Sequence, residues 1–311
     1  MTKKRTEESI IKHYLENEKS AKDLPAQAGY LLALYCYSKN KHEQSLEELL
    51  KAIQKEDQRW DLYQHLVYLG KKSENLKAVY ERLNSSMEKY ADNHNLHFCL
   101  GMAYLLDKKI SEAIDEFQKA ISLNPDLPLS HFLLGISYLE CICASNLEKE
   151  KSSLLISLVD QEFSKAKECD KSIQVKRFEE GVSLLGQGKY QQALKEFKQV
   201  LEEILEADLV FGAFEKLALY HFIAPEIVDY EMVQQAIQEL DQRMEDRENP
   251  HAHNRLGVAY LLFLKLLFRE AENCFEQARQ ISPKFQKPLR NLKFLKEEEE
   301  EFSNLFEFLR F

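Results

Sequence analysis

Small and large apolar residues recur at fixed offsets along this chain, inside stretches that read as continuous helix. The segment 100–125, LGMAYLLDKKISEAIDEFQKAISLNP, has a tyrosine three residues after its glycine and an alanine twelve after it. A phenylalanine follows four residues later, and a proline eight beyond that. Apolar residues at such spacing are typical of amphipathic helices. The segment therefore predicts two helices joined by a turn near Lys108.

The same pattern returns along the chain. Gly101 and Gly135 lie 34 residues apart, Gly181 follows after 46, and Gly257 opens a further copy, LGVAYLL. A period of this size indicates a stack of similar structural units. Each glycine is followed by the large and small residues of a second helix: Ala113, Phe117, Ala120 and Pro125; Phe163 and Ala166; Ala193 and Phe197; Ala271, Phe275, Ala278 and Pro283.

These offsets resemble the pattern of the tetratricopeptide repeat (TPR) family. The resemblance is clear at 94–127 and 250–283 and degenerate at 128–173 and 174–207. Two antiparallel helices approach closely where glycine or alanine makes room, and large aromatic rings fill the gaps between successive pairs. The resemblance implies an all-α fold, a right-handed superhelical solenoid of antiparallel helix pairs.

Weaker helix pairs extend the register at about 25–56, 59–91 and 208–249. We therefore predict one TPR-like helical repeat array over 25–283, with fifteen or sixteen helices in the whole chain. Segment 1–24 is expected to form an N-terminal helix that caps the array, since a terminal helix lacks one neighbour. Segment 284–311 is expected to form a C-terminal helix with an acidic and aromatic tail.

Composition narrows the classes of function. With 9 Gly and 7 Pro in 311 residues, breakers of helix are scarce. The 52 acidic and 42 basic residues give a net charge of −10, which disfavours binding to nucleic acid. No apolar stretch of about 18 residues and no signal sequence occurs, so we expect a cytoplasmic protein without a membrane span. The six cysteines lie within apolar helical patterns and are expected to be reduced and mostly buried.

Enzyme and metal motifs are absent from the sequence. No GxxxxGK, GxGxxG, HExxH or GxSxG occurs, and the paired glutamates lie in charge-rich patterns without an apolar pocket. We therefore predict no enzymatic activity, no cofactor and no metal. The residues nearest to a metal-binding set lack the spacing of zinc ligands: His94, His97, Cys99, His131, Cys141 and Cys143.

The resemblance also implies a binding groove. With the glycine counted as position eight of each repeat, TPR proteins use positions two, five, nine, twelve and thirteen of the first helix to contact ligands. Phe98, Phe132 and Phe178 share position five and are expected to form a partly accessible aromatic ladder; the alternative is that a neighbouring helix covers them as core. The expected groove residues are Phe98, Met102, Leu105, Phe132, Ile136, Leu139, Phe178 and Val182, with Asn95 and Leu129 at position two and Leu106 and Glu140 at position thirteen.

The groove is apolar, which favours an apolar or amphipathic segment of a partner protein as its ligand. TPR modules that grip the terminal carboxylate of heat-shock chaperones carry lysine at position five and asparagine at position nine. Here these positions hold Phe98 and Met102, so the sequence does not predict a carboxylate clamp.

The final stretch, EEEEEFSNLFEFLRF, places Phe302, Leu305, Phe306 and Leu309 on one helical stripe. This stripe either packs on the last repeat or is a short helix offered to a partner's groove. The sequence as a whole predicts a non-catalytic protein-interaction adaptor or assembly factor. The alternative is a structural subunit of a larger complex that contacts partners through its convex face and its C-terminal helix.

Overall fold

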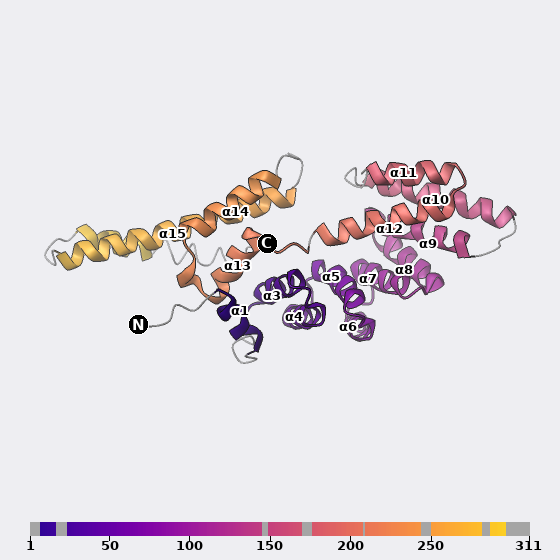
Figure 1. Cartoon of the computed structure of the whole chain (residues 1–311). Coiled ribbons are helices and arrows are strands. Elements are labelled where there is room, and N and C mark those ends of the chain that lie inside the picture. The colour runs from indigo at the N-terminus through magenta and orange to yellow at the C-terminus, as the bar shows by residue number, and fades with distance from the viewer. Residues whose placement is uncertain are drawn as a thin grey trace. The chain divides into compact units, whose positions relative to one another are not determined.

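The computed structural model confirms an all-α fold, and the described part of the chain contains no strand (Figure 1). The described residues are 7–16, 24–144, 149–169, 176–207, 209–243, 250–281 and 287–296. The chain divides into two compact units, Cys36–Val210 and the combination of Met1–Tyr35 with Phe211–Phe311.

In the unit Cys36–Val210, most successive helices pack against one another along the chain. We call α5, α7, α9 and α11 the first helices of their pairs. The helices are α4 (His42–Lys55), α5 (Asp61–Lys72), α6 (Leu76–Met87), α7 (His94–Leu106), α8 (Ile110–Leu123), α9 (Pro128–Ala144), α10 (Lys149–Cys169), α11 (Lys176–Gly186) and α12 (Tyr190–Ala207).

The tight turns in this unit share one backbone conformation. The residue at position fifteen adopts the left-handed conformation, which ends the first helix and reverses the chain. At the α7–α8 turn this residue is Lys108, with φ of 60°, and the next N–H, of Lys109, donates to the carbonyl of Tyr104 at 2.9 Å. The other left-handed residues are Asn40 (φ 58°), Glu74 (φ 56°) and Gly188 (φ 72°).

The recurring glycines are the close crossing points of the helix pairs. A Cβ atom on Gly101 would lie 2.8 Å from the ring of Phe117. The same holds for Gly135 against Phe163, at 2.5 Å, and for Gly181 against Phe197, at 2.7 Å. Contacts this short are overlaps, so only glycine lets the large ring of the second helix lie flat on the first. The offsets in the sequence are therefore contact points of the helix pairs.

The second unit contains the two ends of the chain. The hydroxyl of Tyr14 donates to the carbonyl of Ile223 at 3.1 Å, which links the first helix to a helix more than 200 residues later. Its elements are α1 (Glu7–Glu16), α3 (Ala26–Ser38, whose last residues belong to the other unit), α13 (Ala213–Ile223), the short 3₁₀ helix η2 (Pro225–Ile227), α14 (Tyr230–Arg243), α15 (Pro250–Ile281) and a helix at 287–296.

The prediction of a helix pair at 250–283 is wrong, because α15 is one continuous helix of 32 residues. Between its glycine and alanine positions the sequence reads VAYLLFLKLLFRE, two residues longer than the corresponding stretch after Gly101. This stretch contains no glycine, asparagine or proline to end a helix, and leucine is a strong helix former. As a result a Cβ atom on Gly257 would meet no neighbouring atom within 4 Å, and Tyr260 is 51% exposed.

The cysteines are free thiols, but the expectation that most are buried is wrong. Cys36 and Cys99 are buried, Cys141 and Cys143 are half-buried, and Cys169 and Cys274 are exposed. Burial raises the pKa of the Cys36 thiol to about 12, so this thiol is protonated at neutral pH.

Candidate protein-binding surface

The predicted aromatic ladder is buried. Phe98 is 8% exposed, Phe132 is fully buried and Phe178 is 1% exposed, so the expectation of partly accessible rings is wrong. The Phe132 ring centroid lies 5.7 Å from that of Phe163 and 5.9 Å from that of Phe178. At position five of α9 and α11 the rings of Phe132 and Phe178 therefore lie in the core of the unit.

The groove residues further along the first helices are covered as well. Met102, Leu105, Ile136 and Leu139 are all buried, whereas Val182 is 39% exposed. The helix α12 packs against both α9 and α5 (Figure 1). Its polar contacts lie in the C-terminal halves of these two helices. The role of these residues in partner binding stays a prediction.

Polar contacts hold α12 in this place. Lys198 makes an ion pair with Glu140 of α9. Further along α12, the Glu206 carboxylate accepts hydrogen bonds from the hydroxyl of Tyr68 and from Nζ of Lys72, the latter at 3.2 Å. The hydrogen bond from Tyr68 lowers the pKa of Glu206, which keeps this carboxylate charged.

Residues at the N-terminal ends of α5, α7 and α9 line an open cavity of about 200 Å³, which we call the hollow. Positions two and five of α5, Asp61 and Gln64, lie beside the equivalent Asn95 and Phe98 of α7. Leu129 of α9 completes the set. The full lining is Trp60, Asp61, Gln64, Asn95, Phe98, Cys99, Leu127, Pro128, Leu129 and Ser130.

Local sequence places these residues. The side chain of Asn93 caps α7 by accepting hydrogen bonds from the N–H groups of Asn95 and Leu96, at 2.9 and 3.2 Å. Pro128 is the first residue of α9, where its fixed φ favours helix and its missing N–H is not needed. Both helix starts therefore open onto the hollow with defined geometry.

The hollow is mostly apolar, with a few polar groups. Asp61 is neutralised by Arg59, whose Nη2 and Nε atoms lie 2.7 and 2.9 Å from its carboxylate oxygens. The Oγ atom of Ser130 is buried and has no hydrogen-bond partner. Burial raises the pKa of the Cys99 thiol, which removes it as a nucleophile. This lining is better suited to holding an apolar side chain with an adjacent hydrogen-bonding group than to catalysing a reaction.

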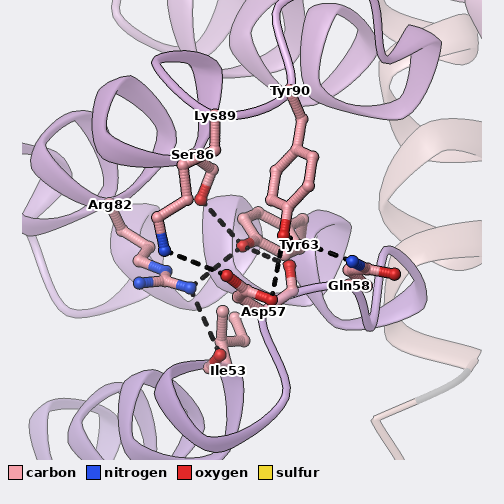
Figure 2. A network of polar contacts seen from close by, with 8 residues as sticks. All are labelled: Ile53, Asp57, Gln58, Tyr63, Arg82, Ser86, Lys89 and Tyr90. Carbon is pink, nitrogen blue, oxygen red and sulfur yellow. Dashed lines mark hydrogen bonds and ion pairs between the residues drawn. The ribbon is translucent and has the colours of Figure 1, made fainter.

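A polar network fixes the loop that carries Trp60 to the edge of the hollow (Figure 2). The Asp57 carboxylate accepts hydrogen bonds from Lys89 at 3.1 Å and Tyr90 at 3.3 Å. The hydroxyl of Tyr63 donates to the Asp57 carbonyl at 3.0 Å and lies 2.8 Å from Oγ of Ser86. The hydrogen bond from Lys89 lowers the pKa of Asp57, so this anchor stays charged at neutral pH.

The histidines at position four are structural. Nδ1 of His97 lies 2.6 Å from Glu116, and its Nε2 lies 2.9 Å from the Ala91 carbonyl. His131 makes the same contacts with Glu162 at 2.5 Å and the Pro125 carbonyl at 2.8 Å. Each ring is thus held between a carboxylate and a backbone carbonyl. In the part of the chain that the structure describes, no three metal-ligating side chains converge.

Arg177 occupies position four in the α11–α12 pair, where its Nη1 lies 2.8 Å from Glu196. In each of these three successive pairs, a basic side chain on the first helix therefore contacts a glutamate on the second. Burial disfavours the charged form of His131, but the hydrogen bonds that its ring makes to the Glu162 carboxylate and to the Pro125 carbonyl outweigh this effect and raise its pKa.

Sequence reasoning located one side of the hollow and missed the other. Asn95, Leu129 and Phe98 were expected in a groove and do line the hollow. Trp60, Asp61 and Gln64 were missed because the pair at 59–91 has no glycine–phenylalanine signal at its crossing. Counting 34 residues back from Asn95 would have found Asp61. The predicted tail residues Phe302, Leu305, Phe306 and Leu309 lie outside the described residues.

Comparison with known proteins supports the resemblance stated above. A family model described as a TPR repeat matches residues 101–140, so this segment, from Gly101 in α7 into α9, is a TPR repeat. No curated protein sequence matches the chain. Solenoids built from such repeats present extended binding surfaces and generally act as non-catalytic scaffolds.

Solved structures with a similar arrangement share little sequence with this chain. Human IFIT1, solved as a dimer with m7Gppp-AAAA, is 14% identical over 89% of this chain and 68% of its own, with a TM-score of 0.45. A tetratricopeptide repeat protein from Parabacteroides merdae is 14% identical over 87% of this chain and 99% of its own, with a TM-score of 0.36. Yeast Tom70 is 16% identical, covering 95% of this chain and 60% of its own, with a TM-score of 0.37.

A helix that spans a membrane must be both long and apolar. None of the described helices combines these two properties to the degree that a span requires.

Proposed function

We propose that this chain is a non-catalytic protein-interaction adaptor or assembly factor that receives an apolar side chain of a partner protein in the hollow. One observation carries the proposal: first helices of three successive pairs contribute side chains to a single open cavity of about 200 Å³. A cavity of about 150 Å³ accommodates a benzene-sized group in proteins. The hollow therefore has room for one large side chain, such as leucine or phenylalanine.

The chemistry of the lining favours a protein ligand over nucleic acid. The residues that line the hollow include no lysine and no arginine, and the one charged side chain among them is Asp61. Binding to phosphate backbones depends on basic side chains. Burial of one large apolar side chain contributes roughly 1.5–3 kcal/mol. The amides of Gln64 and Asn95 at the rim are placed to hydrogen-bond the backbone beside that side chain.

Site-specific photocrosslinking tests this proposal directly. A photoreactive amino acid replaces Gln64 in the hollow, and the matched control carries it at Lys77 on α6, whose side chain is 87% exposed. After irradiation in native lysate, we expect crosslinked species at position 64 that protease removes and nuclease does not. Equal crosslinking at both positions would contradict the proposal, and nuclease-sensitive species would identify a nucleic-acid ligand instead.

A pair of leucine variants sharpens the result. Leu129→Arg places a charge in the hollow, while Leu123→Arg places the same charge on α8, where the leucine is already 43% exposed. We expect the first variant to lose the partner identified by crosslinking and the second to retain it, with both keeping the wild-type circular dichroism spectrum.

A second candidate function is supported by α15. Tyr260, Leu264 and Leu267 are between 37% and 51% exposed, which leaves apolar area on this helix open to a further contact. A structural subunit that contacts its neighbours through this unit would crosslink from position 264 and not from position 64.

A further inference from the structure

The long helix α15 carries a largely exposed stripe of residues at heptad spacing. From Gly257 to Ile281, successive members of the stripe are alternately three and four residues apart. Seven residues fall slightly short of two helical turns, so this spacing forms a narrow contact line between two helices that coil around each other. We call these residues the seam: Gly257, Tyr260, Leu264, Leu267, Ala271, Cys274, Ala278 and Ile281.

The seam lies away from the face by which α15 packs in its own unit. Val258, Leu262 and Leu266 are between 2% and 5% exposed, and α15 packs against α14. In contrast, Tyr260 is 51% exposed and Ile281 is 85% exposed. The other seam residues are exposed or half-buried. The seam therefore offers a contact line about 37 Å long that contains no charged side chain.

Large and small side chains occupy opposite halves of the seam. The first half contains one tyrosine and two leucines, and the second half contains two alanines and a cysteine. At the two ends this order is reversed, with Gly257 at the start and Ile281 at the finish. When two copies of the helix run antiparallel about position 269, every layer joins one large and one small residue. The layers are Gly257 with Ile281, Tyr260 with Ala278, Leu264 with Cys274, and Leu267 with Ala271 of the second copy.

Other arrangements of two copies do not give even layers. Parallel helices would set each leucine against itself and each alanine against itself. An antiparallel register shifted by one heptad would set Leu264 against Leu267 and Gly257 against Cys274. Wide layers would then lie beside narrow ones, which close packing disfavours. The seam is thus complementary to itself in one direction and one register, which favours a second copy of this chain as its partner.

We propose that the seam is the interface of a homodimer in which the α15 helices of two copies pair antiparallel. A twofold axis near position 269 makes the contact isologous, so each layer occurs twice. The inference is independent of the hollow, which lies in the other unit. A dimer carries two hollows, so a partner with two apolar anchors would bind it with increased avidity.

Light scattering after size-exclusion chromatography of the purified full chain tests the dimer. We expect a mass near twice the 36.5 kDa of one chain. Leu264→Glu/Leu267→Glu places four charges in the interface and should raise the dissociation constant by about a hundredfold or more. The matched control, Leu123→Glu/Leu154→Glu, changes leucines that are 43% and 63% exposed in the other unit and should remain dimeric. A monomeric wild type would overturn the proposal.

A cysteine pair tests the direction and the register. In the proposed dimer, position 264 faces Cys274 of the second copy, so Leu264→Cys should form a disulfide-linked dimer on mild oxidation. Within one helix these positions are about 15 Å apart, too far for a disulfide. The matched control, Leu264→Cys/Cys274→Ser, should not form the link. A wild-type dimer linked through Cys274 alone would indicate parallel pairing and contradict the proposal.

A photoreactive amino acid at position 264 separates the second copy from other occupants of the seam. In the purified chain we expect a crosslinked species of twice the mass of one chain. A crosslink within one chain to residues 297–311, which lie outside the described residues, would overturn the proposal.

Two controls separate loss of the dimer from other failures. Circular dichroism shows whether Leu264→Glu/Leu267→Glu is folded; if it is not, Tyr260→Glu replaces it. Crosslinking from position 64 should persist in the folded monomeric variant, so its loss would concern the proposed function and not the dimer.

Discussion

The segments 94–127 and 250–281 begin with almost the same apolar pattern and fold differently. In the first, α7 and α8 form a tight pair with Phe117 against Gly101; in the second, α15 continues as one helix and Gly257 faces no neighbour. The two segments differ mainly at the turn, where Lys108 is left-handed in one and Leu264 is helical in the other. Similar apolar offsets are therefore compatible with a helix pair or with one long helix, and the residues at the turn position determine which of the two forms.

The largest expected difference between the two segments concerns their phenylalanines. Phe117 is fully buried, so Phe117→Ala should destabilise its unit by about 3–5 kcal/mol. Phe275 of α15 is only half-buried, and Phe275→Ala should cost much less. Chemical denaturation followed by circular dichroism measures both. Similar losses would mean that α15 buries its ring as a helix pair does.

The glycines give the next largest contrast. Gly101→Leu drives a branched side chain into the Phe117 ring and should cost roughly 1–3 kcal/mol through overpacking. Gly257→Leu meets open space in α15 and should be neutral or slightly stabilising, because leucine is a better helix former than glycine. A fall in melting temperature for Gly257→Leu as large as that for Gly101→Leu would contradict the continuous helix.

Glycine at the turn position should change the free energy of unfolding in opposite directions in the two segments. Lys108→Gly relieves the left-handed backbone and should stabilise the α7–α8 pair by up to about 1 kcal/mol. Leu264→Gly, at the corresponding offset in α15, should destabilise by about 1 kcal/mol or more, because glycine weakens a helix interior. Denaturant midpoints of the two variants test the signs. Stabilisation by Leu264→Gly would show that this segment bends.

The smallest expected effect is the pH dependence that His131 brings to the α9–α10 pair. The pKa of His131 is raised in the folded chain, so its contribution to stability is present below the unfolded value near 6.5 and is lost as the pH rises through the folded pKa. The melting temperature should fall between pH 6 and pH 8.5 by on the order of 1 °C. His131→Gln should flatten this difference. A change at His253 of α15, which is exposed, should leave it unaltered.

The fold was accessible from the sequence where contacts are local. Gly101 and Phe117 lie sixteen residues apart and face one another in a single pair, so their offset predicts their contact. The TPR repeat, the all-α fold and one side of the hollow followed from such offsets. These features depend on neighbours within one or two repeats.

The covering of the first helices could not be predicted in the same way. The sequence pattern within one repeat carries no information about which other helices pack on it. An open groove was therefore predicted for four residues that are buried: Met102, Leu105, Ile136 and Leu139. The later helix α12 packs on α9 and α5, and this contact is not written in the pattern of a single repeat. Trp60 was missed for a related reason, since its pair lacks the glycine that marks the register.

The contact between Tyr68 and Glu206 also bears on how the unit Cys36–Val210 folds. In most solenoids each repeat touches only its neighbours, so that stability is a sum of local terms and unfolding can begin at an end. Here residues 138 positions apart in the sequence are joined across the array. Contacts of such high sequence separation slow folding and couple distant elements. This unit should therefore unfold in one cooperative transition, because its last helix, α12, is bound to the early helix α5.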